Sequence, residues 1–433
     1  MGLAQAKRDA LADRIADLSF DGAGWLGAAR GDALTRLSAM GLPGKRDEYW
    51  RYSDPATLIS AAPALAKAFN PGDEAPAFEA IDCVKLVFVD GVFDAAASDD
   101  LSLAGVQIER LAQIAAPADH WACDLYGVLE TRGQSPVPRS LAALNTCFAT
   151  EGVLIRVTGK ADRPVSLIYH HISDSSDVIL HHCIKIEPGA EFTLLESGPA
   201  AARLNMVMEI DVGDGGRFSH VRMQGRDHDR RAVTHLFARI GKGSAFKSFT
   251  LTANGRLTRN EAVIELTGSD ASAHLAGAAL GDGDFHQDDT VFVTHAAERC
   301  ESRQVFKKVL KNGAVGVFQG KILVKQGAQK TDGYQISQAL LLDGDPVLGD
   351  AQFLAKPELE IYADDVKCSH GSTSGAIDET ALFYLRSRGV PVAAAQSLLV
   401  LAFLAEAIGE IEDPSIADDI RIRLEGWLRR HEG

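Results

Sequence analysis

Three related tetrapeptides recur in one part of the chain: GAEF (Gly189–Phe192), GGRF (Gly215–Phe218) and GSAF (Gly243–Phe246). Each places a phenylalanine after a turn that contains glycine, and positions 192, 218 and 246 are 26 and 28 residues apart. His274, in the sequence SAHL, follows after another 28 residues. A drifting period of this size, with room for more than one strand per repeat, is typical of the turns of a β-helix or solenoid.

The sequence around these tetrapeptides consists of short β-rich runs. From Gly152 onward, runs of about four to eight residues rich in β-branched and aromatic side chains are separated by Gly and Asp, which leaves no room for helices of ordinary length. Examples are GVLIRV (Gly152–Val157) and FTLLES (Phe192–Ser197). An antiparallel sandwich would account for the same runs and stays open as the alternative, but the period favours a solenoid.

Both ends of the chain have helical patterns instead. The segment Trp25–Met40 has leucines near helical spacing and is followed by Gly41, a typical helix stop. Near the other end, Asp378 and Asp413-Pro414 are typical helix starts. We therefore predict three regions: an N-terminal helical region with a small strand pair at 1–150, a β core at 151–365 and a C-terminal helical domain at 366–433.

Composition narrows the classes of partner. The chain has 433 residues and a net charge of -15, which disfavours nucleic acid and anionic lipid as partners. Its six cysteines are widely spaced and form no CxxC pair, which indicates reduced thiols rather than a disulfide framework. The N-terminus lacks the apolar segment of a signal peptide, and the longest apolar run, Leu398–Ala405, is too short to cross a membrane. These features predict a cytoplasmic protein.

One pair of residues has the character of metal ligands. In DDVKCSHGSTSG (Asp364–Gly375), Cys368 and His370 would lie on the same face if the segment is extended. A thiolate beside an imidazole suits iron or zinc. Both could equally be structural, the cysteine as a small buried side chain and the histidine in a turn. Because two ligands cannot complete a four-ligand cluster site, a metal role would require donors from a second chain or a transient site.

Other candidates are weaker. His295 and Cys300, in HAAERC, need not converge, and the doublets His170/His171 and His181/His182 fit solvated or edge positions better than a metal site. The chain contains no GxxxxGK[ST], GxSxG or HExxH motif, so we expect neither ATP hydrolysis nor these hydrolytic chemistries. Several acids, including Asp282, Asp284, Asp288 and Asp289, leave open a β-helix hydrolase or lyase acting on polysaccharide.

Five segments resemble the SufB/SufD family of iron-sulfur cluster assembly proteins. They are GLPGKRDEYWRYSD (41–54), HAAERCESRQ (295–304), GVFQGKILVKQGAQKTDGYQ (316–335), LEIYADDVKCSHGSTSG (359–375) and DETALFYLRSRGV (378–390). The resemblance covers residues 41 to 390, and its KCSHG and FYLRSRG blocks are highly specific. The SufB branch lacks a KCSHG-type block at this place and has a longer N-terminal region, so the resemblance is to the SufD branch, with SufB as the runner-up.

The resemblance implies a mainly β fold, with a right-handed parallel β-helix core between N-terminal and C-terminal α-helical regions. It implies a non-catalytic scaffold subunit rather than an enzyme, one that pairs with SufB through the β-helix and binds the ATPase SufC through the C-terminal helical domain. His370, with Cys368 beside it, would then contribute to a transient iron-sulfur cluster, or to iron, shared with SufB. The family also suggests a flavin at the level of the complex. For the isolated chain, both a monomer and a homodimer stay open.

Overall fold

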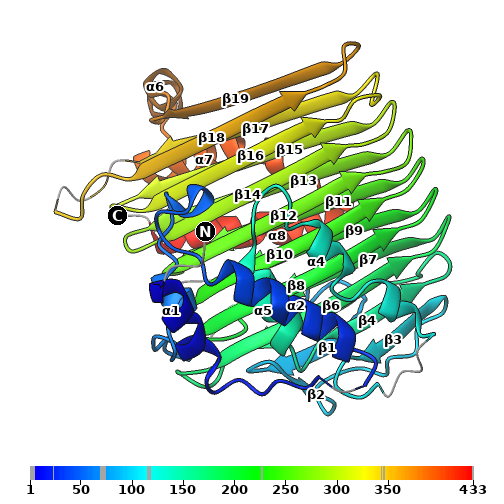
Figure 1. Ribbon diagram of the computed structural model, residues 1–433. Coiled ribbons are helices and arrows are strands. Elements are labelled where there is room, and N and C mark those ends of the chain that lie inside the picture. Colours follow the sequence, from blue (N-terminus) through cyan, green and yellow to red (C-terminus); the bar gives the residue numbers. More distant parts are fainter. Residues whose placement is uncertain are drawn as a thin grey trace.

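Two sheets of mostly parallel strands form the centre of the molecule in the computed structural model, which describes residues 5–22, 24–68, 75–114, 119–225, 228–342, 344 and 347–431 (Figure 1). Sheet A contains β1 (Val84–Val89), β2 (Val92–Asp94), β5 (Val165–His170), β7 (Glu191–Ser197), β9 (Arg217–Gln224), β11 (Ala245–Ala253), β13 (Ser272–Asp282), β15 (Glu301–Lys311), β17 (Asp332–Leu341) and β19 (Lys367–Gly375). Sheet B contains β3 (Val106–Arg110), β4 (Val153–Val157), β6 (Asp177–Ile186), β8 (Arg203–Val212), β10 (Arg231–Ile240), β12 (Leu257–Leu266), β14 (His286–His295), β16 (Val315–Val324) and β18 (Gln352–Ile361).

Consecutive strands from β4 to β19 alternate between the two sheets, and each pairs in parallel with the strand two positions along the chain. The chain therefore winds as a solenoid, which confirms the predicted parallel β-helix and excludes the antiparallel sandwich. Apolar side chains from both sheets fill the space between them, which we call the lumen. The sequences of such strands are nearly continuous runs of hydrophobic residues, because both faces of each strand are buried.

The repeat of phenylalanines marks successive turns of the solenoid. Phe192 pairs with Phe218 and Phe218 with Phe246, and the ring centroids of the two pairs are 6.2 and 5.6 Å apart. The predicted continuation at His274 is wrong by one position, because Ala273 is the residue that pairs with Phe246. Since neighbouring residues of a strand point to opposite faces, His274 lies outside the lumen, where its ring contacts Glu410.

Helices cover the outer face of each sheet. The N-terminal helices lie on sheet B, and their contacts are with β6, β8 and β10 (Figure 1). They are α1 (Gln5–Ile15), α2 (Gly27–Met40), α3 (Ala56–Ile59), α4 (Val128–Arg132) and α5 (Ser140–Phe148), with 3-10 turns at Glu48–Trp50 and Trp121–Asp124. The predicted hairpin is β1–β2, with a positive φ at both Asp90 and Gly91.

The C-terminal helices are α6 (Glu379–Ser387), α7 (Val392–Ile408) and α8 (Pro414–Arg430), and α7 packs on β13 and β15 of sheet A. Asp378 and Asp413 accept hydrogen bonds from the first backbone N–H groups of α6 and α8, as predicted for helix caps.

The solenoid continues to Gly375, whereas the sequence placed the end of the β core at residue 365. Residues 1–4 and 432–433, at the outer ends of the two predicted helical regions, lie outside the described residues. None of the described helices has the length and hydropathy needed to span a membrane.

Candidate functional site

The predicted metal ligands lie on the last strand of the solenoid. In the sheet order, β19 is paired with β17 on one side and has no strand on its other side among the described residues. The last strand of the opposite sheet, β18, is also an edge strand. Both lie at the upper end of the molecule in Figure 1, with α6 beside β19. An edge of this kind presents unpaired backbone groups to which another chain can add.

Cys368 and His370 lie on one face of this strand, as the sequence predicts for extended backbone. Cys368 pairs with Gly333 and His370 with Gln335, both on β17. Cys368 is half-buried and contacts the apolar cluster of Ile322, Val324 and Ala328, so its side chain faces the lumen. His370, two residues along, has the same orientation on the strand, but it is exposed because no further turn of the solenoid covers it.

The chemistry of the two side chains differs. An exposed imidazole offers a nitrogen lone pair to a metal ion without a burial cost. Burial raises the pKa of the Cys368 thiol, which keeps it protonated in the isolated chain and makes it a poorer ligand until a metal ion displaces the proton. His370 is therefore the more accessible of the two, and Cys368 can serve either as a second ligand or as part of the apolar packing.

A dense cluster of metal-ligating side chains exists elsewhere, on the outer face of sheet B. In the described part of the chain, the one group of three such residues within ligand distance of one another is His181, Cys183 and Glu209. All three are fully buried. The Glu209 carboxylate already contacts His181 Nε2 at 2.8 Å and accepts backbone N–H groups at the start of α4. Both Glu209 oxygens therefore already have partners within the protein. We interpret the cluster as structural, because it joins the start of α4 to sheet B.

The histidine doublets differ from the sequence prediction of solvated or edge positions. His170 is exposed, but His171, His181 and His182 are buried because the strands and loops around them are covered on both sides. His171 Nδ1 lies 2.7 Å from Nε2 of His228, and burial lowers the pKa of His228 to about 3. The rings of His171, His181 and His182 each have hydrogen-bond partners within the protein, which indicates structural roles.

Two family models match the chain along most of its length. The model "SUF system FeS cluster assembly, SufBD core domain" matches residues 170–403, and the model "SufBD protein N-terminal region" matches residues 12–167. The chain belongs to the SufBD family. The core model spans the solenoid turns from β6 to β19 and continues into α7, so it includes the candidate edge.

Relatives in several bacteria agree with this assignment. The Iron-sulfur cluster assembly protein SufD of Escherichia coli (strain K12) is 27% identical over 407 residues, which cover 90% of each chain. An iron-sulfur cluster assembly SufBD family protein of Synechocystis is 27% identical over 423 residues, 90% of this chain and 89% of the relative. The SufD protein of Bacillus subtilis (strain 168) is 26% identical over 282 residues, 63% of each chain. This chain is thus a SufD-like iron-sulfur cluster assembly protein of the SufBD family.

Two of the acids that left a polysaccharide-cleaving enzyme open form buried ion pairs on opposite faces of sheet B. Asp288 is buried on the outer face of sheet B and pairs with Arg259, whereas Asp289, the next residue, faces the lumen and pairs with Lys308. His295 and Cys300 are likewise structural: His295 Nε2 lies 2.8 Å from the hydroxyl of Ser302, and the Cys300 thiol donates to a backbone carbonyl.

Exposed aromatic side chains on α6 were not singled out from the sequence. Phe383 is 72% exposed and Tyr384 54% exposed, although α6 itself is anchored by buried Leu382. The signal was present in ETALFYLRS, because the four consecutive large apolar residues from 382 to 385 cannot all face inward from one helix. On α8, by contrast, the apolar side chains Ile416, Ile420 and Leu424 are buried against sheet A and α7.

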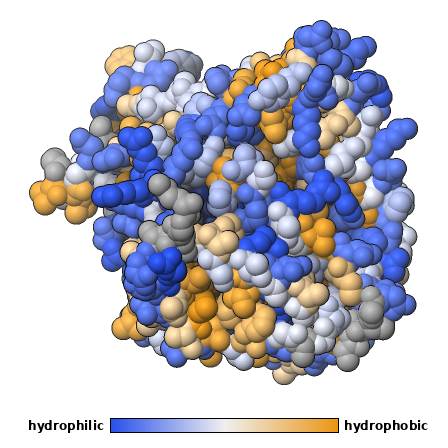
Figure 2. Space-filling view, in the orientation of Figure 1, coloured by the Kyte–Doolittle hydropathy of each residue, from blue (hydrophilic) through white to orange (hydrophobic). Residues whose placement is uncertain are grey.

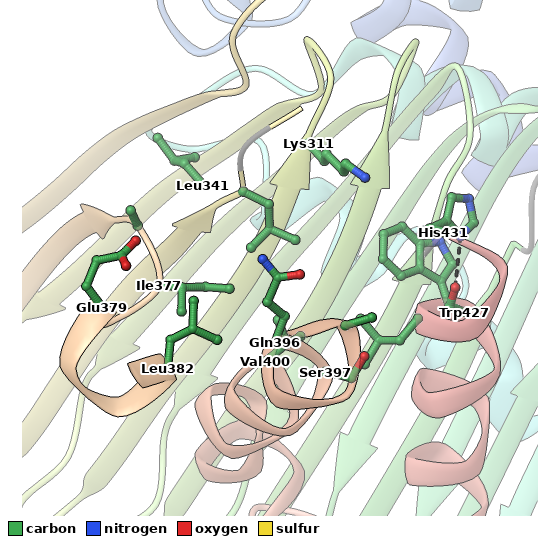
Figure 3. Close-up of a pocket in the computed structure, with 14 residues that line it drawn as sticks. Lys311, Leu341, Ile377, Glu379, Leu382, Gln396, Ser397, Val400, Trp427 and His431 are labelled. Carbon is green, nitrogen blue, oxygen red and sulfur yellow. Dashed lines mark hydrogen bonds between the residues drawn. The ribbon is translucent and has the colours of Figure 1, made fainter. Parts of the chain in front are cut away.

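A cavity of about 250 Å³ lies between the C-terminal helices and sheet A (Figure 3). In Figure 3, Lys311 and Gln396 point toward this space, and Trp427 and His431 lie across it from Glu379. His431 stacks on Trp427 with ring centroids 4.1 Å apart. The volume is below the range typical of cofactor sites, so we assign no ligand to it.

Proposed function

We propose that this chain is a non-catalytic scaffold subunit that supports iron-sulfur cluster assembly at its boundary with a SufB partner in the cytoplasm. In this proposal, His370 supplies one ligand to the nascent cluster, which is the cargo of the complex, and SufB supplies the thiolates. The observation that carries the proposal is the position of His370, an exposed imidazole on an edge strand to which another chain can add.

The open end of the solenoid supports pairing with a second β-helix. Both sheets end there, in β18 and β19, and no described helix covers the end in the way that helices cover the outer faces. Figure 2 shows hydrophobic residues among hydrophilic ones toward this upper end, and Ile361 and Tyr362, where β18 ends, are 41% and 65% exposed. A related solenoid could extend both sheets across this surface and bury its apolar side chains. A homodimer of the isolated chain could use the same edges.

Incomplete ligation is consistent with a transient cluster. Iron-sulfur clusters are usually held by four cysteine thiolates, and histidine ligands change their potential. Cys368 and His370 are at most two donors, so a cluster held here needs further donors from another chain. Such a shared site would release its cluster when the two chains separate.

The C-terminal domain is the proposed contact for the ATPase SufC. Helix α6 projects beside β19 with Phe383 and Tyr384 exposed, and large exposed aromatic residues are typical anchors of protein interfaces. Helices α7 and α8 pack on sheet A, so movement of α6 and α7 by a bound ATPase would be transmitted toward β15, β17 and the edge. A flavin at the level of the complex remains part of the proposal.

The test is the variant His370→Ala in a complex co-expressed with SufB and SufC. We expect the complex to form with unchanged stoichiometry on size exclusion, and the iron and acid-labile sulfide per complex to fall at least about tenfold, since removing a ligand costs more than removing a residue that supports one. His170→Ala, which alters another exposed histidine on β5 of the same sheet, is the matched control. Wild-type cluster content in His370→Ala would refute the assigned role, and failure of the wild-type chain to bind SufB or SufC would refute the scaffold itself.

Cys368→Ala and Cys368→Ser separate the two roles of the cysteine. If Cys368 is part of the apolar packing, the alanine variant keeps the cluster content. If it is a ligand, both variants lose cluster content, because neither replacement provides a thiolate.

A further inference from the structure

Two glutamine side chains in the lumen beneath His370 have no hydrogen-bond partner. Gln335 on β17 and Gln304 on β15 are both completely buried, and neither the amide nitrogen nor the amide oxygen of either residue is hydrogen-bonded within the described residues. Leaving a buried amide unpaired costs roughly 1–3 kcal/mol per group, so most buried polar groups in proteins have a partner. Four unpaired atoms in adjacent turns therefore require an explanation.

The register of sheet A places these residues in one column that ends at the candidate site. Gln304 pairs with Gln335, and Gln335 pairs with His370. In-register side chains on neighbouring strands lie on the same face, about 4.8 Å apart along the sheet. The imidazole of His370 is thus the next polar group above the Gln335 amide, and it is the last member of the column.

The opposite sheet leaves room for this amide. Gly320 on β16 faces Gln335 across the lumen, and a Cβ added to Gly320 would lie only 2.6 Å from the amide atoms. Any other residue at position 320 would displace the Gln335 amide. Because Gly320 has no side chain, the Gln335 side chain can extend across the lumen directly beneath the exposed edge.

We propose that Gln335 is a positioning residue for His370: rotation of the exposed ring brings the N–H of one ring nitrogen onto the Gln335 amide oxygen, which is unpaired in the structure, and leaves the lone pair of the other ring nitrogen directed toward the cluster iron at the boundary with the partner. This proposal rests on the proposed function of His370. A neutral imidazole has one N–H and one lone pair, so fixing the proton on the inner nitrogen fixes the ligating nitrogen as the outer one. Metal-binding histidines almost always have such a partner on the nitrogen that does not bind the metal.

The first measurement is the tautomer of His370 in the isolated full-length chain. Long-range 1H–15N NMR spectra of 15N-histidine-labelled protein report which ring nitrogen carries the proton, and His370→Ala identifies the signal among the 13 histidines. We expect a single dominant tautomer in the wild type and a mixture in Gln335→Met, which keeps the length of the side chain and removes its hydrogen-bonding groups. Gln335→Glu, which keeps an acceptor, is expected to restore the wild-type tautomer. Gln304→Met changes the same residue type one turn farther from His370 and is expected to leave the tautomer unchanged.

The second measurement is the rate of cluster formation in the complex with SufB and SufC. We expect Gln335→Met to lower this rate about tenfold, as is usual when a partner of a metal ligand is removed, and Gln304→Met to leave it unchanged. If Gln335→Met unfolds at a lower temperature than Gln304→Met, Gly320→Ala provides an independent test, because it displaces the amide and keeps Gln335. It is expected to produce the same mixture of tautomers.

The outcomes distinguish the positioning role of Gln335 from the proposal on which it rests, that His370 is a cluster ligand. A wild-type tautomer and a wild-type rate in Gln335→Met, together with cluster loss in His370→Ala, would overturn the role of Gln335 and leave that of His370 intact. No effect of His370→Ala would overturn both. A tautomer change in Gln304→Met equal to that in Gln335→Met would also overturn the inference, because the effect would then belong to the packing of the lumen in general.

Discussion

The Nε2 atom of His181 lies 2.8 Å from the Oε1 atom of Glu209, and both side chains are fully buried. The same carboxylate accepts the backbone N–H groups of Gly127, Leu129 and Glu130, where α4 begins. One acid on β8 therefore binds a histidine on β6 and the first turn of a helix in the N-terminal region. It connects that region to the outer face of sheet B.

Glu209→Ala is expected to destabilise the protein by about 3–5 kcal/mol, because it leaves His181 and three helix N–H groups without their buried partner. Urea unfolding followed by circular dichroism measures the loss, and limited proteolysis is expected to cut the N-terminal region first. The control is Asp284→Asn, which removes an exposed partner of Arg256 and is expected to change stability by less than about 1 kcal/mol. Equal stability of the two variants would contradict the role of Glu209.

His295 is expected to make the protein sensitive to mild acid. Burial lowers the pKa of this histidine from 6.5 to about 4. Between these two values the unfolded chain binds a proton that the folded chain does not, so stability is complete above about pH 6.5 and is lost as the pH falls toward 4. The loss is about 1.4 kcal/mol per pH unit within this window.

The measurement is the free energy of unfolding at pH 7 and pH 5 for the wild type and for His295→Gln. The wild type is expected to lose about 2 kcal/mol more than the variant over this interval, since the variant lacks the titrating ring. Identical losses in both proteins would show that His295 does not contribute to acid sensitivity.

The solenoid could be predicted from the sequence because three successive turns of the solenoid share a glycine-containing loop followed by a phenylalanine. The rings of Phe192, Phe218 and Phe246 occupy the same place in successive turns, so their spacing reveals the period. The pattern fails where a small residue, Ala273, takes this place. The sequence prediction fails again at β19, because a strand at an open end is not buried on both faces and lacks the apolar run that identifies the others.

The candidate site could be predicted in part. Cys368 and His370 are two residues apart in the sequence, and an extended backbone is enough to place them on one face. The position of Gln335 beneath His370 depends on the register between β17 and β19, which are separated in the chain by β18, and no local pattern encodes this register. The buried cluster at Glu209 depends in the same way on contacts between β6, β8 and α4.

Phe383→Asp is expected to weaken SufC binding without affecting the fold. The side chain is 72% exposed, so its replacement is expected to change the free energy of unfolding by less than about 0.5 kcal/mol. Loss of a central aromatic anchor typically costs about 2 kcal/mol or more in binding, equivalent to about a 30-fold increase in Kd. Val92→Asp, also exposed but in the hairpin at the other end of sheet A, is the control. Calorimetric titration of SufC into both variants checks the difference, and an unchanged Kd for Phe383→Asp would exclude Phe383 from the contact.

Lys308 and Asp289 form an ion pair inside the lumen, with Nζ 2.6 Å from Oδ2, and both side chains are almost completely buried. Lys308→Met is expected to destabilise the protein by about 3–5 kcal/mol, because it leaves a buried carboxylate without its cation. The double variant Lys308→Met/Asp289→Asn is expected to regain most of this loss, since the remaining partners of Asp289, Gln287 and Asn260, can still hydrogen-bond to an amide. Urea midpoints of the two single variants and the double variant measure the coupling. Additive effects of the two substitutions would contradict it, since they would show that each charge is stabilised independently of the other.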